Sequence, residues 1–412
     1  VRFLTLVPDP PPAWGGILLF AGAASGLLGI LFAIAQADLK RLLAYSSVEN
    51  IGIILMGLGL ALLGRSMHQP GWVVLGLAGA LLHVWNHALF KSLLFLGAGA
   101  VLHGAQTRQI DRMGGLAKAM PWTAACFLAG AVAICGLPPM NGFAGEWLLY
   151  LGLLKTLPGP GVGAAFAVPA LAMIGALAVA AFVKVYGIAF LGEPRSESAR
   201  HAHEAPLAMR LPMVLLAGLC ALIGLAPLLV APALDAAVAG WQSDAGAGVA
   251  TLAPLSYLGM TGLALAAAAA AATLLLGRIG GAPRRGPTWD CGYIRPTARM
   301  QYTGTAFSEL LTALFHPLLR PTLHRPTVRG LFPASTQTRS QIDDAVLDRL
   351  LLPLGRRIQD RLNGFRRFQQ GLTQHYVLYI LLALLALAAA LLPFTPTPAP
   401  TPAASTRNEA AP

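Results

Sequence analysis

Residues 73–102 form an almost wholly apolar run that is long enough to cross a lipid bilayer as one helix. Three ionisable residues interrupt this run, His83, His87 and Lys91, and their spacing of four places them on one helix face. Titratable groups inside a hydrocarbon-embedded helix are costly, so function is the default explanation for them. Hydrogen bonding to neighbouring helices is the simpler alternative, but two His and a Lys on one stripe exceed what helix association needs. We therefore predict that the stripe is part of a proton relay.

The rest of the chain repeats the pattern of long apolar runs. The whole chain is 56% hydrophobic and 11% charged, a balance typical of α-helical membrane proteins rather than soluble domains. The fold class expected is an all-α polytopic transmembrane helix bundle with one discontinuous helix, a long cytoplasmic-face amphipathic helix and a final transmembrane helix. The other predicted passages are residues 14–35, 42–63, 122–157 (interrupted), 164–191, 211–230, 255–276 and 376–392.

Basic residues predict the orientation of the bundle. They gather in alternate loops, whereas the opposite segment 231–254 contains no Lys or Arg. By the positive-inside rule the basic loops are cytoplasmic and both ends of the chain lie on the other side. This placement accounts for the net charge of +12 without nucleic acid, because no basic groove interleaved with aromatic residues is present. The basic residues concerned are Lys40, Arg41, Arg108, Arg112, Lys118, Arg195, Arg200, Arg210 and those of the stretch 278–367.

The fourth passage contains a helix breaker between two apolar halves. Pro138 and Pro139 remove backbone donors and clash with the preceding turn, and Gly142 relieves the backbone. Broken helices at membrane depth survive where protein or water satisfies the freed groups, and in transporters they mark ion sites. Glu146 follows one turn later, so we predict that it lies on a proton pathway; a packing role is the alternative.

Two further charged residues interrupt apolar passages. Glu49 lies eight residues beyond Arg41 on the same helix face, where it can pair with Arg41 or with Lys91 of the next passage. A place on the proton pathway and a structural salt link both stay open for Glu49. Lys184 lies about two turns from the cytoplasmic end of its helix, and snorkelling towards the interface is as good an explanation as a relay role.

No cofactor or metal site is predicted. His201, His203 and Glu204 fall in a polar loop, which we interpret as solvated. The four cysteines, Cys126, Cys135, Cys220 and Cys291, show no Cys-x-x-Cys pairing, so neither an iron–sulfur cluster nor structural zinc is expected.

Apolar residues recur every three or four positions from Ile342 to Leu372, opposite an Arg-rich face. This predicts an amphipathic helix, bent at Pro353, that contacts lipid headgroups or sister subunits. The preceding part, residues 284–333, is rich in Pro and Arg and is expected to be irregular. The Pro-rich tail is expected to be disordered.

The predicted organisation has five parts. Residues 1–232 form a proton-translocating helix bundle, 233–277 an additional transmembrane helix, 278–372 the cytoplasmic insert, 373–393 the terminal transmembrane helix, and 394–412 the tail. The chain opens on Val1 with no signal peptide, and we expect it to be the back part of a longer protein.

Three stretches together resemble a known family. They are Asp38-Leu-Lys-Arg-Leu-Leu-Ala-Tyr-Ser-Ser, the His83/His87/Lys91 helix followed by Ser-Leu-Leu-Phe-Leu, and Gly136-Leu-Pro-Pro-Met-Asn-Gly-Phe-Ala-Gly-Glu-Trp. The family is that of the proton-conducting, antiporter-like membrane subunits of respiratory complex I and related hydrogenases. The segments around Glu49, Lys184-Val-Tyr-Gly, 288–293 and 297–302 resemble the hydrogenase-4 component B/formate hydrogenlyase subunit 3 branch.

The resemblance implies two inverted repeats, each with one broken helix and a half-channel, of which this chain holds the second. It implies that Lys91, with His83 and His87, carries the central polar axis. Glu146 then lies on the connection towards the outside, and Lys40 at the cytoplasmic approach. It also implies that redox cofactors belong to partner subunits.

The function expected is that of a proton-translocating subunit in the bacterial inner membrane, coupled to electron transfer in a hydrophilic redox or hydrogenase arm. Other membrane subunits and lipids are the remaining expected partners. Two alternatives stay open: a subunit of a multisubunit sodium/proton antiporter, and a non-conducting scaffold. Catalysis by this chain alone is not expected, because no nucleophile triad, nucleotide loop or metal-ligand spacing is found.

Overall fold

The computed structural model describes residues 10–159, 161–242, 247–279, 297–298, 300–324, 339–343, 347–368 and 371–391. The chain divides into two compact units, residues 1–343 and 344–412. The predicted tail and the segment 288–293 lie outside the described residues, as does Cys291.

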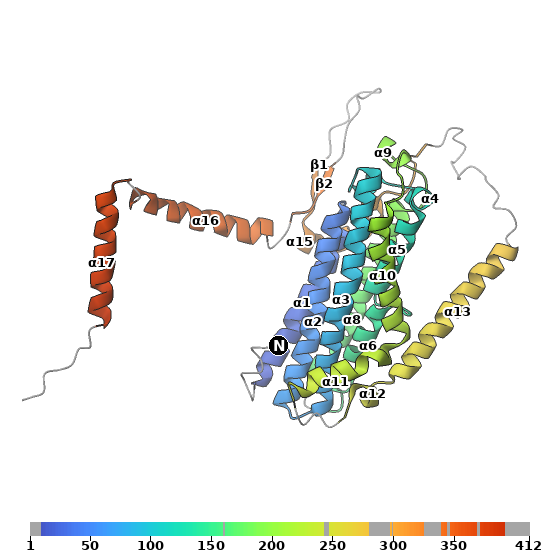
Figure 1. The fold of residues 1–412 in the computed structure, drawn as a ribbon, viewed down its shortest axis with the longest axis horizontal. Helices are drawn as coiled ribbons and strands as arrows, with labels where there is room; N and C mark the ends of the chain where they lie inside the picture. The colour runs from blue at the N-terminus through green and yellow to red at the C-terminus, as the bar shows by residue number, and fades with distance from the viewer. Residues whose placement is uncertain are drawn as a thin grey trace, which may run out of the picture. The chain divides into compact units, whose positions relative to one another are not determined.

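Long apolar helices build the first unit (Figure 1). Across the described part of the chain, seven helices are long and apolar enough to cross a membrane, and the interrupted passage accompanies them. This confirms the predicted polytopic helical fold. The six in the first unit are α1 (Pro12–Ile34), α2 (Leu39–Ser66), α3 (Pro70–Ala105), α8 (Ala167–Ala189, preceded by α7, Val162–Ala165), α10 (Leu207–Leu225) and α13 (Leu255–Ile279).

Glycines bring α1 and α2 into backbone contact. A Cβ added to Gly22 would lie 2.6 Å from the carbonyl oxygen of Gly52, and one added to Gly15 would lie 2.8 Å from that of Gly59. Lipid tails are as apolar as the helix surface, so the hydrophobic effect does not drive helices together within a membrane. Close backbone approach instead supplies the van der Waals contacts that hold the helices together. The α1–α2 pair is therefore fixed by its small residues, as is α2 against α3 at Gly57 and Gly76.

The interrupted passage is two half-helices. α5 (Pro121–Ile134) and α6 (Asn141–Leu154) have 14 residues each, so each rises about 21 Å and neither crosses a bilayer alone. The predicted discontinuity is confirmed. The break is packed from two sides, because a Cβ on Gly142 would collide with the Ala133 carbonyl oxygen and one on Gly224 of α10 with that of Pro139.

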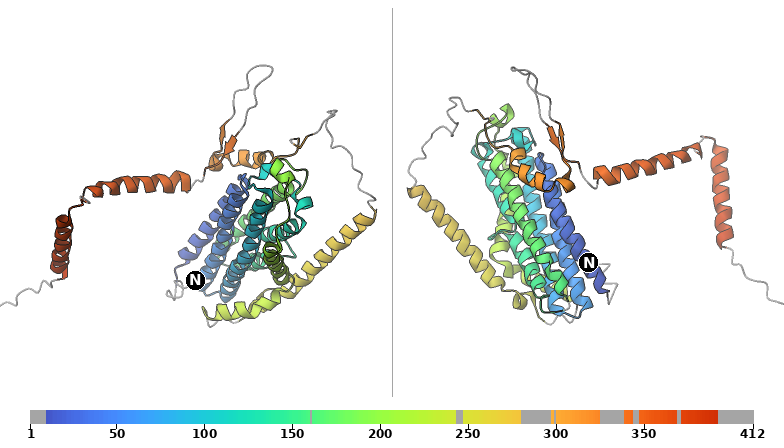
Figure 2. Two further views of the ribbon diagram at one scale, coloured as in Figure 1. Left: turned by 45° about the horizontal axis from the view of Figure 1, so that its top comes forward. Right: turned by 180° about the vertical axis from the view of Figure 1, so that it is seen from behind.

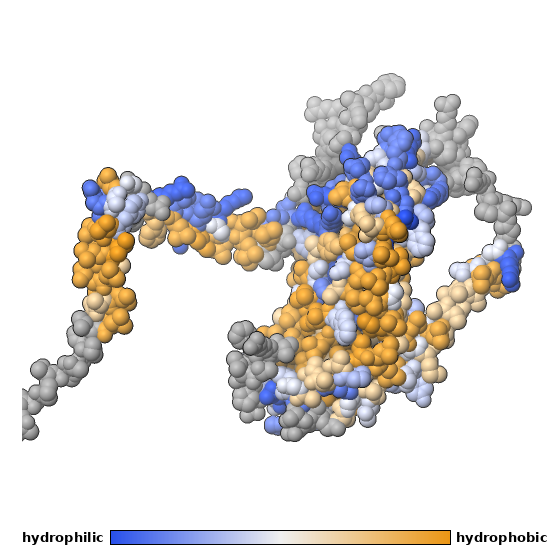
Figure 3. Space-filling model, viewed as in Figure 1, coloured by the Kyte–Doolittle hydropathy of each residue, from blue (hydrophilic) through white to orange (hydrophobic). Residues whose placement is uncertain are grey.

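Short elements close the two ends of the bundle. The basic end carries η2 (Ile110–Arg112), α4 (Leu116–Ala119) and α9 (Glu197–Arg200), and hydrophilic residues gather there in Figure 3. The opposite end carries η3 (Pro227–Val230), α11 (Ala231–Ala239) and α12 (Val249–Leu252). The loops predicted to be cytoplasmic thus meet at one end of the bundle.

The expectation of an irregular segment at 284–333 was wrong for part of it. Thr303 accepts a hydrogen bond from the backbone nitrogen of Ala306 and begins α14 (Gly304–Leu314), which packs on α8. α15 (His316–Leu319) follows, and β1 (Thr322–His324) pairs antiparallel with β2 (Arg339–Gln341). The Pro and Arg residues flank this helix rather than fill it, which is why composition concealed it.

The second unit holds the amphipathic segment. It consists of η4 (Leu347–Leu351), α16 (Leu352–Asn363), η5 (Gly364–Phe368) and α17 (Thr373–Leu391). The π-helical turn η4 ends two residues before Pro353, where the sequence predicted a bend. The predicted start at Ile342 was wrong, because Ile342 follows β2 and is buried in the first unit.

Candidate functional site

Lys91 is buried within the bundle, and its ammonium is satisfied by α2. The Nζ atom donates to the carbonyl oxygen of Leu43 at 2.7 Å and to the hydroxyl of Ser46 at 2.6 Å. The side chain is 6% exposed. No ion pair joins Lys91 to an acid among the residues that the structure describes, so neutral oxygen atoms hold its charge.

His83 is buried two turns before Lys91 on α3 and also contacts α2. Its Nε2 lies 3.0 Å from the amide oxygen of Asn50, and Asn50 donates to the carbonyl oxygen of Ser46 at 2.7 Å. Ser46 and Asn50 are one turn apart, so they match the helical spacing of the α3 stripe. They link His83 to Lys91 through α2, a role that the sequence analysis did not give them although their spacing of four was visible.

Glu49 is 1% exposed and lies where the backbones of α1 and α2 are in close contact. A Cβ on Gly29 would lie 2.5 Å from the backbone nitrogen of Glu49. The carboxylate interacts electrostatically with Lys91 and with Glu146, and its Oε2 has no hydrogen-bond partner. Neither of the two ion pairs considered from the sequence, with Arg41 or with Lys91, is formed between these side chains.

Glu146 on α6 is buried against the break. A Cβ on Gly136 would lie 2.6 Å from both carboxylate oxygens of Glu146. Gly136 also has a φ of +60°, which residues with a side chain rarely adopt. Gly136 therefore makes room for the carboxylate at the point where the helix is interrupted. Its role was not predicted, although it stands directly before the breaker.

An asparagine pair fixes the first residue of α6 to the middle of α3. Asn86 donates to the carbonyl oxygen of Asn141 at 2.7 Å, and Asn141 donates to the side-chain oxygen of Asn86 at 3.1 Å. Both residues are fully buried. Because Asn86 lies between His83 and His87, the pair sets the position of the broken helix relative to the α3 stripe.

Several buried polar atoms along this region have no hydrogen-bond partner among the residues that the structure describes. They are Nδ1 of His83, Nε2 of His87, Oε2 of Glu49 and Oδ1 of Asn141. His87 itself is half-buried. Buried polar groups in native proteins are hydrogen-bonded to protein or to ordered water, so these atoms are suited to bind water. Together with Lys91, Ser46, Asn50, Asn86 and Glu146 they form what we call the polar axis.

Lys184 lies apart from the polar axis, at the end of α1. Its Nζ donates to the carbonyl oxygens of Ile34 at 2.5 Å and Gln36 at 2.8 Å. With 2% exposure it does not snorkel, so that explanation was wrong. Its position stabilises the C-terminus of α1, where unpaired carbonyls attract a cation.

Lys40 is half-buried in the first turn of α2. Asp38 begins this helix by accepting hydrogen bonds from the backbone nitrogens of Lys40 and Arg41, and it forms an ion pair with Arg108 at 2.7 Å. The structure thus places Lys40 at the basic end, outside the polar axis.

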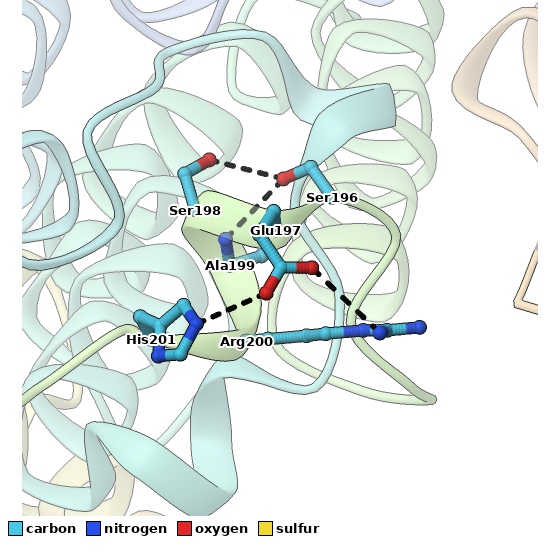
Figure 4. A network of polar contacts seen from close by, with 6 residues as sticks. All are labelled: Ser196, Glu197, Ser198, Ala199, Arg200 and His201. Atoms are coloured by element: carbon cyan, nitrogen blue, oxygen red, sulfur yellow. Dashed lines mark hydrogen bonds and ion pairs between the residues drawn. The ribbon is translucent and has the colours of Figure 1, made fainter.

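His201, Arg200 and Glu197 of α9 and its C-terminal end form a polar network (Figure 4). The Nε2 of His201 lies 3.0 Å from Oε1 of Glu197, and Arg200 lies 3.7 Å from the other carboxylate oxygen. These side chains are largely exposed. Among the residues described, no group of three or more His, Cys, Asp or Glu side chains is arranged to hold a metal ion.

A family model described as NADH:quinone oxidoreductase/Mrp antiporter, transmembrane, matches residues 1–168. The chain is 40% identical over 403 residues to hydrogenase-4 component B of Escherichia coli (strain K12), covering 92% of the chain and 59% of that protein. It is 40% identical over 324 residues to formate hydrogenlyase subunit 3 of the same organism, covering 77% of the chain and 52% of that protein. The chain therefore spans between half and two thirds of the length of these relatives.

One solved structure has the same fold. It is that of the membrane-bound sulfane sulfur reductase, an archaeal respiratory membrane complex, with a TM-score of 0.66 and 23% identity. The match covers 92% of this chain and 57% of the other. This likeness supports the helical architecture alone.

Proposed function

Residues 1–168 belong to the NADH:quinone oxidoreductase/Mrp antiporter transmembrane family, and we propose that this membrane protein translocates protons as a subunit of a complex I-like or hydrogenase complex. Electron transfer in partner subunits supplies the free energy, and the polar axis carries the protons. The relatives named hydrogenase-4 component B and formate hydrogenlyase subunit 3 favour a hydrogenase partner.

The observation that carries the proposal is the burial of four titratable groups around one set of polar contacts. Lys91, His83, Glu49 and Glu146 are each at most 6% exposed. Removing an ion from water costs several kcal/mol even after relaxation, roughly the whole stability of a small domain. A scaffold gains nothing from this cost that apolar residues would not provide, whereas a proton pathway requires it.

We assign the groups as follows. Lys91 exchanges protons with His83 and His87 through water along the stripe, while Ser46 and Asn50 hold Lys91 and His83 in position. Glu49 couples electrostatically to both Lys91 and Glu146, so a change of charge at one is felt at the other. Glu146, at the helix break, connects the axis to the outside, and Lys40 and Lys184 belong to the cytoplasmic side.

The second unit supports assembly with other subunits and lipid. Every described side chain of α16 and α17 is at least partly exposed, and their large apolar residues are uncovered within the unit. Figure 3 shows the apolar surface along α17. We propose that lipid and neighbouring membrane subunits cover these faces in the bacterial cytoplasmic membrane, and that a hydrophilic redox arm completes the complex.

The test is Lys91→Met in the full complex. Methionine keeps most of the side-chain volume and removes the exchangeable proton, so proton translocation should fall at least tenfold while the complex still assembles. Lys155→Met is the matched control, because Lys155 is exposed at the opposite end of the bundle. Proton uptake by vesicles and the yield of purified complex are measured together. Translocation at the parent rate with Lys91→Met would reject the proposal.

A further inference from the structure

A polar cavity of about 300 Å³ lies at the basic end of the first unit. One side is formed by the connection between α1 and α2, by the first turn of α2 and by Lys184. The other side is formed by α14, which lies at that end of the bundle in both views of Figure 2. The cavity is lined by Ala35, Gln36, Ala37, Asp38, Arg41, Gln109, Lys184, Thr305, Ser308, Thr312, Pro321 and Ile342.

α14 presents its hydroxyl groups to this cavity. Thr305, Ser308 and Thr312 follow the spacing of one helix face, and all three line the cavity. Leu310, on another face, is 79% exposed. A polar cavity of this size holds several water molecules, at roughly 30 Å³ each in the liquid.

Lys184 supplies a proton-exchanging group in the wall of the cavity. An ammonium has three N–H donors, and two of them are used by the carbonyl oxygens of Ile34 and Gln36. A neutral amine keeps two N–H donors, so both carbonyls remain hydrogen-bonded when the third proton leaves. The proton can therefore be lost and regained without the end of α1 losing its cap.

The cavity and Lys91 both contact the first two turns of α2. Arg41 lines the cavity, and Leu43 and Ser46, which accept the hydrogen bonds of Lys91, are two and five residues further along the same helix. At 1.5 Å per residue, the axial separations are about 3 Å and about 7.5 Å. The cavity wall and the acceptors of Lys91 are thus separated by less than two turns of α2, on different faces of that helix.

Specific contacts hold α14 in place. Gln301 accepts from the backbone nitrogen of Glu193 at 3.0 Å and donates to its carbonyl oxygen at 3.1 Å. Arg195 donates to the carbonyl oxygen of Tyr302 at 2.8 Å, and Asp111 accepts from the backbone nitrogen of Gly304 at 2.5 Å. The segment after α13 is therefore fixed to the loops that follow α3 and α8.

We propose that this cavity is the hydrated inlet through which cytoplasmic protons reach Lys91, with α14 as its wall and Lys184 as its proton-exchanging group. The inference rests on the proposed function and names an entrance for it. In each transfer the Lys184 ammonium releases one proton to water on the path to the Lys91 amine, and the Lys184 amine then takes one proton from a hydronium ion that enters the cavity from the cytoplasm.

The first test obstructs the cavity. Thr312→Cys is combined with Cys291→Ser in the same chain of the full complex. Inside-out vesicles that contain this complex are treated with a bulky membrane-impermeant methanethiosulfonate reagent. We expect labelling and at least a fivefold slower proton uptake. Leu310→Cys is the control on the exposed face and should be labelled without loss of rate. Absence of labelling at residue 312, or an unchanged rate after complete labelling, would overturn the inlet.

The second test separates proton exchange from capping. Lys184→Arg keeps the cation and the donors to Ile34 and Gln36 but does not exchange its proton near neutral pH. The inlet predicts assembled complex with at least fivefold slower uptake, and full uptake would mean that Lys184 is only a cap. Lys91→Met distinguishes a failure of the inlet from a failure of the proposed function. If it abolishes uptake while labelled Thr312→Cys and Lys184→Arg leave it unchanged, the inlet is wrong and the proposed function stands; if Lys91→Met is also without effect, the proposed function fails.

Discussion

At the scale of single residues, the polar axis combines groups held by protein acceptors with groups that have an open hydrogen-bonding position. Lys91 has two strong acceptors from α2, whereas Glu49 has an oxygen without a protein partner. A buried group with every bond made is rigid, and one with a bond open can change partners as its charge changes. Lys91, which uses two of the three N–H donors of its ammonium, and Glu49, which has an open oxygen, together suit charge that moves in steps.

Glu146→Gln tests the outward end of the axis. Glutamine preserves the volume and the hydrogen bonding beside Gly136 but cannot titrate, so proton translocation should fall at least tenfold with the complex intact. Proton release by vesicles measures this directly. Glu309→Gln, on the exposed side of α14, is the control and should retain the parent rate. Parent-rate translocation by Glu146→Gln would make Glu146 a packing residue.

At the scale of elements, the broken helix depends on contacts made outside its own backbone. The Asn86–Asn141 pair joins it to α3, and glycines on both sides let backbones reach the break. α6 begins at Asn141, so the pair also sets where Glu146 lies. Half-helices of 14 residues have little stability alone, which makes these contacts the ones that define the break.

A double-mutant cycle measures the coupling of this pair. Asn86→Ala removes both hydrogen bonds of the pair, whereas Asn141→Ala removes only the one to the Asn86 side-chain oxygen, so each should destabilise the complex by about 1–2 kcal/mol, Asn86→Ala by the larger amount. The double variant should cost less than the sum, with a coupling of about 1 kcal/mol. Reversible unfolding in detergent gives the free energies. Strictly additive losses would show that the two side chains do not act together.

The sequence predicted the helices and the break because long apolar runs, paired prolines and charges in those runs are local signals. It did not predict Gly136 as the space for the Glu146 carboxylate, or the α1 carbonyls as the acceptors of Lys184. Those contacts join residues of different helices, and no spacing within one helix reports them. α14 was missed because its composition was averaged with the Pro and Arg residues around it.

The apolar face of α16 should be needed for assembly. Ile358→Asp places a charge among Leu354, Leu362 and the neighbouring apolar side chains, where burial against lipid or protein would be costly. We expect the yield of assembled complex to fall several-fold. Gln359→Asp, one residue along on a different face, should assemble normally. Equal yields from both variants would show that this face of α16 stays in water.

At the scale of the whole molecule, the basic end and the cavity beside α14 coincide. The loops after α1, α3 and α8 supply the positive charge, and the segment after α13 is fixed to two of them. If that end faces the cytoplasm, as the positive-inside rule predicts, the inlet opens on the side from which protons are taken up. The role of the cavity as an inlet therefore depends on the basic end of the bundle facing the cytoplasm.

Cysteine labelling from the two sides of the membrane tests this orientation. His201→Cys marks the basic end and Lys155→Cys the opposite end, and both native side chains are exposed. Cys126, Cys135 and Cys220 are buried, so with Cys291→Ser the introduced thiol should dominate labelling. An impermeant maleimide should label His201→Cys in inside-out vesicles and Lys155→Cys in right-side-out vesicles. The reverse pattern would place the cavity on the outside and turn the inlet into an exit. α8 is the one membrane passage between residues 155 and 201. Labelling of both positions from the same side would therefore mean that α8 does not cross the membrane.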